Sequence, residues 1–502
     1  GAPSQRGLRG ERTFFDSLSF PLGGGGKAFL SPALRGGLFC AILDTGKVRC
    51  IVKMQKERLF TNRQLLTLLW PLIIEQMLEI LVGMADTVMV SSVGEAAISG
   101  VSLVDMINQL IITLFGALAT GGAVVTSQHL GAKRPGDAAN SAGQLVGLSA
   151  ILGVGVAAFC LITRTAQLRL FFGTITDEVM QACLTYFTIT ALSFPFLALY
   201  NAGAAIFRST GNSAVSMKVS VIVNGINFCG NALCVFVLKM GVAGVAVPTL
   251  ISRAVGACII LALAARQDYQ LRITPQSVTR FEGRTVKSIL YIGIPSAFEN
   301  SLFQLGRVLV VSMISLFGTV HISANAVANN LDAIGCIVGN AMGLAMITVI
   351  GRCIGAQDFE QTNYYTKKLL LWDYIAQGAV NVVVLLSLNQ ILSIYTLTPE
   401  TRALAWTLVM IHNGMSIFLW PASFVLPNAL RAANDVRFTM VVATASMLVW
   451  RMGLSWVLCV QMGMGAVGVW YAMVVDWICR IICFVARFVS GAWKKNAVKK
   501  AA

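Results

Sequence analysis

Three acidic side chains occupy one long apolar stretch of the sequence. Glu75, Glu79 and Asp86 lie among Leu, Ile, Val and Met residues. Because a helix turns about 100° per residue, Glu79 lies about 40° and Asp86 about 20° from Glu75, so all three share one face. A carboxylate in hydrocarbon is costly and normally faces a bundle interior or a wet cavity. Asp86 and Glu75 are therefore the leading functional candidates, although Glu75 and Glu79 could instead hold structural hydrogen bonds between helices.

Side-chain amides form a second polar stripe in a later apolar stretch. Asn224, Asn227 and Asn231 follow each other at helical spacing, and the last two, four residues apart, face the same way. A carboxylate surrounded by amide and hydroxyl oxygens can coordinate a hard cation or exchange a proton. Asn residues also join helices through hydrogen bonds, so both interpretations stay open.

The other charged and His residues within apolar stretches carry weaker predictions. Four acids that lie near the ends of apolar stretches or form no coherent cluster are Asp105, Asp332, Asp373 and Asp476. Arg307 and Arg451 are expected to pair with carboxylates or backbone oxygens. The three His residues, none with a catalytic partner nearby in the sequence, are His129, His321 and His412. The 12 Cys residues are scattered without metal-ligand spacing, so we expect neither a metal site of this kind nor a disulfide framework.

The chain that carries these residues has the composition of a membrane protein. Of its 502 residues, 56% are hydrophobic and 12% are charged, and its mean hydropathy is +0.74. Soluble domains carry about 25% charged residues. The apolar residues form about a dozen blocks of about 20 residues, which suits membrane-spanning helices and not the alternating strands of a membrane barrel. The sequence therefore predicts an all-α polytopic membrane protein.

Twelve transmembrane helices are expected, and they organise the chain into two lobes. Their ranges are 64–92, 97–128, 139–162, 179–206, 214–238, 243–265, 285–316, 322–350, 368–392, 400–430, 437–460 and 465–489. The expected divisions are a disordered or non-native leader at 1–53, an N-lobe of six helices at 54–266, a cytoplasmic linker at 267–284, a C-lobe of six helices at 285–490 and a basic cytoplasmic tail at 491–502.

The positions of Lys and Arg predict the orientation in the membrane. After Met54, 22 of them fall in alternate loops and flanks that include both ends of the chain, and only four, Arg164, Arg169, Lys239 and Arg402, fall in the other loops. Cytoplasmic loops carry such an excess, so both termini are expected in the cytoplasm. The net charge of +16 includes no basic surface interleaved with aromatic residues, and therefore no nucleic-acid partner is expected.

The two halves of the hydrophobic sequence resemble each other. The pattern P-x-x-x-E-[QN] begins at Pro71 and again at Pro295, a shift of 224 residues. Other pairs related by this shift or one residue less are Gly94 and Gly318, Gly131 and Gly355, and Arg208 and Arg431. Because each half has an even number of helices, the lobes should be parallel repeats related by an axis along the membrane normal. Glu299 thereby matches Glu75, whereas Val310 stands where the first half has Asp86.

The same motifs resemble those of a known transporter family. The segment from Pro71 to Gly100, with its P-x-x-x-E-Q, Asp-Thr-Val and Gly94 to Ser99 portions, is similar to the first helix of multidrug and toxic compound extrusion (MATE) transporters. Further similar segments are 207–211, 241–244 and 430–435, and the resemblance covers about residues 56–490. It implies twelve helices in two lobes, and export of organic, often cationic compounds driven by Na⁺ or H⁺, with no cofactor besides the coupling ion.

The resemblance also implies roles for particular residues. Asp86 matches the family's first-helix aspartate, which is central to cation coupling, and Asn227, Asn231 and Thr249 match its polar partners. Relatives often have Asp in place of Asn231, so a Na⁺ site here would have one negative charge fewer than theirs. No other metal is implied.

In the C-lobe, the resemblance implies a site that is only partly present. Glu299 matches a seventh-helix glutamate of some family members. Their tenth-helix acid falls near Trp420 here, so a site of two carboxylates is incomplete.

We therefore expect a multidrug efflux antiporter that works by rocking between V-shaped outward-open and inward-open states. It should be a monomer in the plasma (inner) membrane, with drugs or organic cations as its partners. A flippase for lipid-linked oligosaccharide or lipid is the alternative, and it would favour a strongly cationic central cavity. A membrane enzyme is disfavoured because H-E-x-x-H and G-x-S-x-G are absent from the sequence, and a channel because no filter-like loop is evident.

Overall fold

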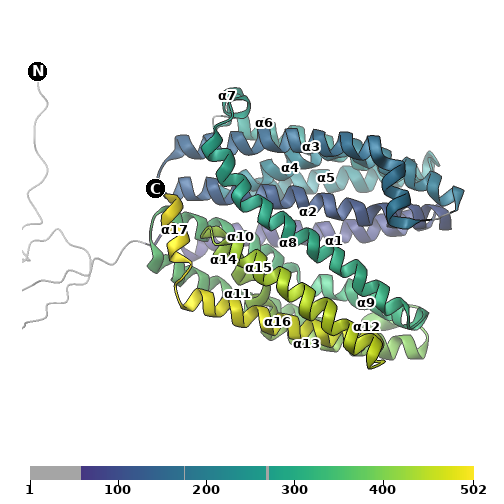
Figure 1. Cartoon of the computed structure of the whole chain (residues 1–502). Coiled ribbons are helices and arrows are strands. Elements are labelled where there is room, and N and C mark those ends of the chain that lie inside the picture. The colour runs from purple at the N-terminus through teal and green to yellow at the C-terminus, as the bar shows by residue number, and fades with distance from the viewer. Residues whose placement is uncertain (1–57, 174–175, 267–270, 502) are drawn as a thin grey trace, which may run out of the picture. The chain divides into compact units, whose positions relative to one another are not determined.

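The computed structural model describes residues 58–173, 176–266 and 271–501. Residues from Leu59 onward form one compact unit, which is built almost entirely of helices (Figure 1). The predicted leader at 1–53 lies outside the described residues.

The first six predicted spans are six long helices, which we call the N-lobe. They are α1 (Asn62–Ser91), α2 (Glu95–Gly131), α3 (Pro135–Phe172), α4 (Asp177–Ser209), α5 (Ser213–Ala232) with its π-helical extension η1 (Leu233–Val237), and α6 (Ala243–Ala265). A capping box fixes the start of α1: the Thr61 hydroxyl accepts a hydrogen bond from the Gln64 backbone N–H, and the Gln64 side chain accepts one from the Thr61 N–H. The short helix α7 (Pro275–Thr279) lies within the predicted linker.

The six later predicted spans form the C-lobe, and most of them are interrupted. They are α8 (Gly283–Ser315); α9 (Thr319–Gly335) with α10 (Ile337–Gly355); α11 (Phe359–Leu386) with α12 (Leu388–Ile394); α13 (Pro399–Trp420) with η2 (Pro421–Val425) and α14 (Leu426–Ala432); α15 (Val436–Ser446) with η3 (Met447–Leu454) and η4 (Trp456–Gln461); and α16 (Gly465–Val489). Pro421 and Pro427 lack the N–H that a regular α-helix needs, which explains the irregular turn between α13 and α14. The final helix, α17 (Lys494–Ala501), lies within the predicted basic tail.

Within the described residues, ten helical segments are long and apolar enough to cross a membrane. The two remaining predicted spans are α8 and α16, which are 33 and 25 residues long. Both carry charged residues in their interior, among them Glu299 on α8 and Arg480 on α16. Glu299 and Arg480 are thus buried charges within helices that are otherwise largely apolar.

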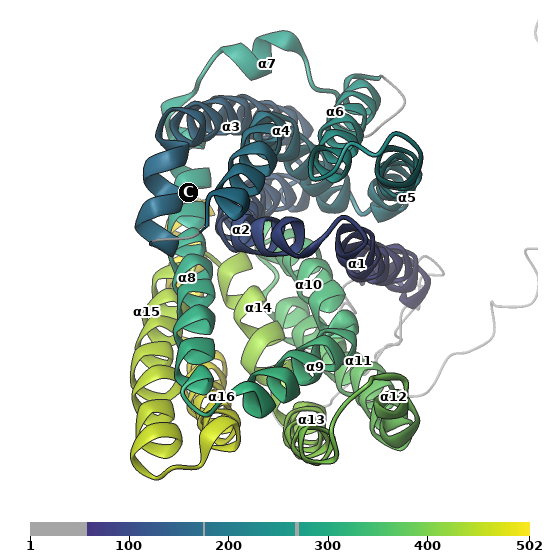
Figure 2. The same ribbon diagram turned by 90° about the vertical axis from the view of Figure 1, so that its right-hand side faces the viewer.

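The first helix of each lobe packs against the other lobe. Figure 2 shows α3 to α6 on one side and the C-lobe helices on the other, with α1 and α2 between them and α8 running across. α1 packs on α5 of its own lobe and on α10 of the C-lobe, while α8 packs on α2 of the N-lobe. Leu65, Leu68 and Leu72 of α1 accordingly lie in the hydrophobic core of the C-lobe. A tilt of α1 or α8 must therefore alter packing in both lobes.

The lobes touch most closely where α2 and α10 end. A methyl group on Gly131 would lie 2.1 Å from the Arg352 carbonyl oxygen, and one on Gly355 would lie 1.9 Å from the Gln128 carbonyl oxygen. Only glycine allows the two backbones to approach so closely. Because Gly131 and Gly355 are related by the 224-residue shift, this contact is symmetric between the repeats.

Side chains on the same two helices reinforce this contact. The Gln128 amide donates to the Ala432 carbonyl oxygen at the end of α14, at 2.8 Å. The Arg352 guanidinium donates to the Ser209 carbonyl oxygen at the end of α4, at 3.1 Å. A side chain at the end of each lobe's second span thus donates a hydrogen bond to a free carbonyl group at the end of the other lobe's fourth span.

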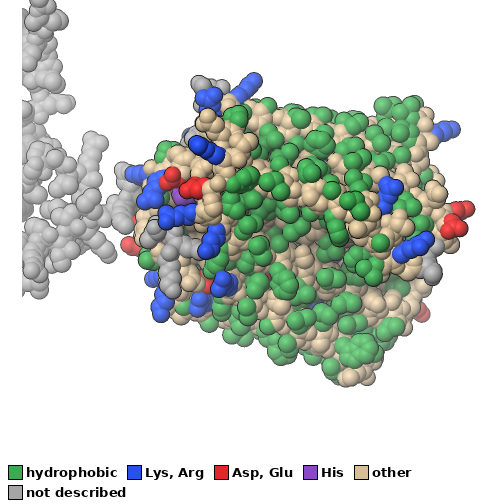
Figure 3. All heavy atoms as spheres, turned by 45° about the horizontal axis from the view of Figure 1, so that its top comes forward, with side chains coloured by type: hydrophobic (Ala, Val, Ile, Leu, Met, Phe, Trp, Pro, Cys, Tyr) green, Lys and Arg blue, Asp and Glu red, His purple; other side chains and the backbone are tan. Residues whose placement is uncertain are grey.

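The surface matches a membrane environment. Hydrophobic side chains cover the middle of the face in Figure 3, and Lys and Arg gather at the end where the described chain begins and ends. Apolar residues such as Ile162, Ile375 and Leu386 are largely exposed. In water this surface would be unfavourable, whereas in hydrocarbon it costs nothing.

Candidate functional site

Four side chains predicted to act together form one chain of hydrogen bonds in the N-lobe. The Asn231 amide on α5 donates to Asp86 Oδ1 on α1 at 2.7 Å and to Asn227 Oδ1 at 3.1 Å. The Asn227 amide in turn donates to Thr249 Oγ1 on α6 at 2.9 Å. The spacing of four residues places both Asn side chains on one face of α5, between α1 and α6. The structure therefore brings Asp86, Asn227, Asn231 and Thr249 together.

The Asp86 carboxylate has no ion-pair partner within 4.0 Å among the described residues, although the cationic Arg253 is close enough to attract it. The Oδ1 atom of Asn231 is buried and has no hydrogen-bond partner. Arg253 on α6 forms its hydrogen bond with Ser193 at 2.7 Å, and it forms no ion pair with Asp86. A half-buried carboxylate beside a buried, unsatisfied amide oxygen is a costly arrangement. Oxygen ligands are those that hard cations prefer, and a carboxylate can also take up a proton.

The three acids of α1 have different environments, although they share a helical face. Glu75 is buried, with its carboxylate 3.3 Å from Arg208 Nη1 on α4 and 3.0 Å from the Ser216 hydroxyl on α5. Glu79 is exposed and accepts a hydrogen bond only from Gln76 of the same helix, at 3.1 Å. The shared face therefore does not create one three-acid site: Glu75 is an interhelical ion-pair residue, and Asp86 belongs to a separate cluster about three turns away.

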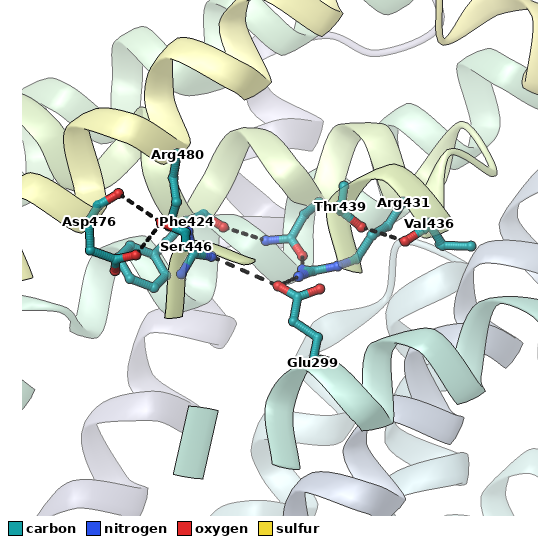
Figure 4. A network of polar contacts seen from close by, with 9 residues as sticks. Glu299, Phe424, Arg431, Val436, Thr439, Ser446, Asp476 and Arg480 are labelled. Carbon is teal, nitrogen blue, oxygen red and sulfur yellow. Dashed lines mark hydrogen bonds and ion pairs between the residues drawn. The ribbon is translucent and has the colours of Figure 1, made fainter. Parts of the chain in front are cut away.

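Glu299 repeats the Glu75 arrangement in the C-lobe with an added cation. Its carboxylate lies 2.6 Å from Arg431 Nη2 on α14 and 3.8 Å from Arg480 Nη2 on α16. Figure 4 shows both guanidinium groups directed toward Glu299. Arg431 also donates to Asn428 at 2.6 Å. The pairs Glu75–Arg208 and Glu299–Arg431 are related by the sequence repeat, which makes this ion pair an inherited feature of both lobes.

One C-lobe cluster was missed by the sequence analysis, which treated Asp332 and His412 as isolated. His412 Nε2 on α13 lies 2.7 Å from Asp332 Oδ1 on α9, and the Cys336 thiol lies 3.2 Å from the same oxygen. The rings of Trp470 and Trp477 pack edge-on against the imidazole. Eighty residues separate Asp332 from His412 in the sequence, so only the packing of α9 against α13 reveals the pair.

The ligand atoms of Asp332, Cys336 and His412 lie within 4.8 Å of one another, the one set of three such residues in the described part of the chain. Two arginines, Arg307 and Arg451, line a cavity of about 40 Å³ beside Asp332. Their positive charge opposes a divalent metal there. We therefore interpret the set as a polar network that joins α9 to α13.

The expected partners of Arg307 and Arg451 are not found. Among the described residues, neither guanidinium forms a hydrogen bond or an ion pair within 4.0 Å, and the Nε atom of Arg451 is buried without a partner. Asp373 on α11 is similarly unusual, because it is fully buried and neither carboxyl oxygen has a hydrogen-bond partner. The sequence carried no signal for either feature beyond the presence of a charge in an apolar stretch.

Comparison with known proteins decides the family. A family model described as MatE matches the chain twice, at residues 71–233 and 295–457. The chain belongs to the MatE family. The two matches begin 224 residues apart, the shift that relates the repeats, and so this MatE protein is confirmed as a duplicated, two-lobed chain.

Individual relatives agree with this assignment. This MatE chain is 28% identical over 439 residues to the "Uncharacterized transporter YisQ" of Bacillus subtilis, covering 86% of this chain and 94% of that protein. It is 24% identical over 445 residues to the "Probable multidrug resistance protein NorM" of Thermotoga maritima, covering 87% and 94%. A solved structure of a multidrug resistance MATE family transporter in an outward-facing conformation matches with a TM-score of 0.80 at 20% identity, over 86% of this chain and 96% of that one.

These findings confirm the twelve-helix, two-lobe fold and the class of protein. MATE family proteins are membrane transporters and not enzymes.

Proposed function

We propose that this protein is a secondary active antiporter that exports organic compounds in exchange for Na⁺ or H⁺. The observation that supports the proposal is the Asp86 cluster: a carboxylate inside an apolar helix that is held by the Asn231 amide without an ion-pair partner. A group of this kind changes its interactions when a cation or proton arrives, because its charge is then neutralised. No cofactor besides the coupling ion enters the proposed cycle.

Alternating access follows from the placement of α1. Neutralising Asp86 weakens its hydrogen bond with Asn231 and so loosens α1 from α5. The same helix packs on α10 of the C-lobe, and Pro71 removes one of its backbone hydrogen bonds, which eases bending. The ion would therefore alter the space between the lobes and the affinity for cargo. Linkage requires that cargo and ion change each other's affinity by the same factor.

We further propose that the protein acts as a monomer in the plasma membrane with both termini in the cytoplasm. The gathering of Lys and Arg at the end that contains the described start and end of the chain supports this orientation (Figure 3). The contact between α2 and α10 would then close the cytoplasmic side, and the cargo path would face outward in this conformation.

Dye export from proteoliposomes tests the proposal. Sodium and pH gradients are imposed separately, and export of the permanent cation ethidium is recorded for the wild type, Asp86→Asn and Glu79→Gln. We expect one of the gradients to drive export, Asp86→Asn to reduce export to the level of protein-free liposomes, and Glu79→Gln to match the wild type because Glu79 is exposed and bonds only within α1. Unchanged gradient-driven export by Asp86→Asn at equal protein content would refute the proposed site.

A flippase of the same superfamily is the second candidate. The arginines of the C-lobe that lack close partners, Arg307 and Arg451, favour it, since a lipid phosphate needs cationic groups. It predicts movement of a labelled anionic lipid between leaflets that is independent of Asp86, which the same proteoliposomes can measure.

A further inference from the structure

The Glu carboxylate of the ion pair faces one guanidinium group in the N-lobe and two in the C-lobe. Glu75 is matched by Arg208 and by the Ser216 hydroxyl. Glu299 is matched by two guanidinium groups, those of Arg431 and Arg480. The repeat shift of 224 places Gly256 where the C-lobe has Arg480, and a methyl group on Gly256 would already lie 2.4 Å from a Val223 methyl carbon. The N-lobe therefore has no room for the second cation.

Arg480 is held in place mainly by an aromatic ring. It is buried, and its guanidinium carbon lies 4.6 Å from the ring centre of Phe424, a cation–π contact. Its nearest carboxylate, Glu299, is 3.8 Å away, longer than a hydrogen bond. The Nε atoms of both Arg480 and Arg431 are buried without hydrogen-bond partners. Two guanidinium groups thus share one carboxylate, and the Nε–H group of each donates no hydrogen bond.

The side chains of Arg431 and Arg480 line a cavity. A cavity of about 190 Å³ is lined by Glu299, Arg431, Arg480, Phe303, Phe424 and Met447, among others. A second cavity of about 140 Å³ shares Asn300, Phe424 and Arg431 with it. Each is smaller than the roughly 300–1,000 Å³ that holds a whole drug-sized molecule. The space therefore suits one part of a larger molecule: a compact anionic group attached to an aromatic ring.

The other charged groups in this neighbourhood do not cancel the positive charge. Asp476, one turn before Arg480 on α16, accepts a hydrogen bond from Ser446 and does not line the cavity (Figure 4). Within the cavity lining, two guanidinium groups therefore stand against the single carboxylate of Glu299.

We propose that Arg480 and Arg431 form a subsite for the carboxylate of an amphiphilic aromatic cargo. The cargo carboxylate would bind the two guanidinium groups beside Glu299, while its ring would pack on Phe424, Phe303 and Met447. The proposal rests on the proposed function and deepens it, because it assigns recognition of a cargo carboxylate to two named residues of the C-lobe. Glu299 then acts as an internal carboxylate that competes with the cargo for Arg431.

Two dyes that differ only at one carboxylate test the subsite. Rhodamine 110 carries a free carboxylate, and rhodamine 123 is its methyl ester. Initial rates of export are measured in proteoliposomes for both dyes, with ethidium as a third substrate that lacks a carboxyl group. We expect the wild type to have about a tenfold lower KM for rhodamine 110 than for rhodamine 123, because a charge-assisted hydrogen bond contributes that much.

The variants separate recognition from folding. Arg480→Gln should raise the KM for rhodamine 110 about tenfold and leave the values for the other two dyes within about twofold, and Arg480→Lys should recover part of the loss. Glu299→Gln, which removes the internal competitor, should lower the ratio of the KM for rhodamine 110 to the KM for rhodamine 123. Arg307→Gln is the matched control, since it removes a C-lobe guanidinium from a different cavity; it should leave the ratio of the two KM values unchanged.

The outcomes distinguish this proposal from the proposed function. If ethidium is exported but the wild type treats both rhodamines alike, or if Arg480→Gln impairs all three dyes equally, Arg480 is a structural counter-ion of Glu299 and the subsite is refuted. If no dye responds to any gradient, the proposed function itself fails. A lipid occupant is tested by increasing the share of phosphatidylglycerol in the liposomes. If phosphatidylglycerol competes with rhodamine 110, the site belongs to a lipid headgroup and the small-molecule cargo is refuted.

Discussion

The N-lobe and the C-lobe are built on one helical plan but place their charges differently. Both keep a Glu on the first helix paired with an Arg at the end of the fourth, and both close on each other through a Gly at the end of the second. The N-lobe adds a carboxylate with amide partners at Asp86, whereas the repeat position in the C-lobe is Val310. The C-lobe instead places a second guanidinium group, that of Arg480, beside Glu299, where the repeat position in the N-lobe is Gly256.

Comparing the lobes separates the features that the duplicated fold requires from those that can vary. Features present in both lobes, the Glu–Arg pair and the glycine contact, hold helices together wherever the plan is used. Features present in one lobe only are free to specialise. In the proposed cycle, the N-lobe offers Asp86 for a cation or proton, and the C-lobe offers Arg431 and Arg480 for part of the cargo.

The largest effect on stability is expected from breaking the shared ion pair. Arg208→Gln leaves Glu75 with only the Ser216 hydroxyl, and we expect a loss of about 2–4 kcal/mol, because an unpaired carboxylate stays buried. Arg431→Gln should cost less, since Arg480 can still face Glu299. Melting temperatures in detergent would show this order. Glu75→Gln combined with Arg208→Gln should recover most of the loss; a larger loss for Arg431→Gln would contradict the view that Arg480 is a surplus cation.

The glycine contact should give a smaller effect that is equal in both lobes. Gly131→Ala and Gly355→Ala each place a methyl group within about 2 Å of a backbone oxygen, so α2 and α10 must separate at a cost of about 1–3 kcal/mol. Hydrogen exchange should become faster at the ends of α2 and α10 in both variants. Gly116→Ala on α2 is the control, because nothing lies within 4 Å of its added methyl group. Unequal effects of the two variants would show that the contact is not symmetric.

The smallest effect is expected at the edge of the Asp86 cluster. Thr249→Val keeps the shape of the side chain but removes the oxygen that accepts from Asn227, which costs about 1 kcal/mol. The cation concentration for half-maximal export should change about fivefold. Thr87→Val, on the same helix as Asp86 but bonded only to its own helix backbone, should have no effect. Equal behaviour of both variants would place Thr249 outside the site.

Much of this architecture could be predicted from the sequence. Continuous apolar blocks of spanning length placed most helix ends within a few residues, but α3 extends to Phe172 instead of 162 and α11 begins at Phe359 instead of 368. A constant shift between the halves revealed the repeat. Both signals could be read from the sequence because they are local or periodic. The breaks within the C-lobe spans were not predicted, since uninterrupted apolarity does not distinguish a straight helix from the π-helical turn at Pro421. The grouping of Asp86 with Asn231 and Thr249 was predicted through family resemblance and not through spacing alone.

The C-lobe chemistry could not be predicted in this way. Asp332 and His412 meet only because α9 packs on α13. The sequence repeat gave no sign of a role for Arg480, because its repeat position is Gly256. Its closeness to Glu299 depends on how α16 crosses α8. Charge pairs between helices distant in the sequence carry no periodic signal, so a charge in an apolar block predicts a partner without identifying it.

If Asp86 couples the ion to the cargo, a gradient of cargo alone must drive ion movement. Proteoliposomes receive an ethidium gradient and no ion gradient, and trapped sodium-sensitive and pH-sensitive dyes record counter-movement of Na⁺ or H⁺. We predict ion movement opposite to ethidium in the wild type and in Asp332→Asn, whose acid lies in the C-lobe, and none above protein-free liposomes in Asp86→Asn. Ion movement that persists in Asp86→Asn and disappears in Asp332→Asn would contradict the account.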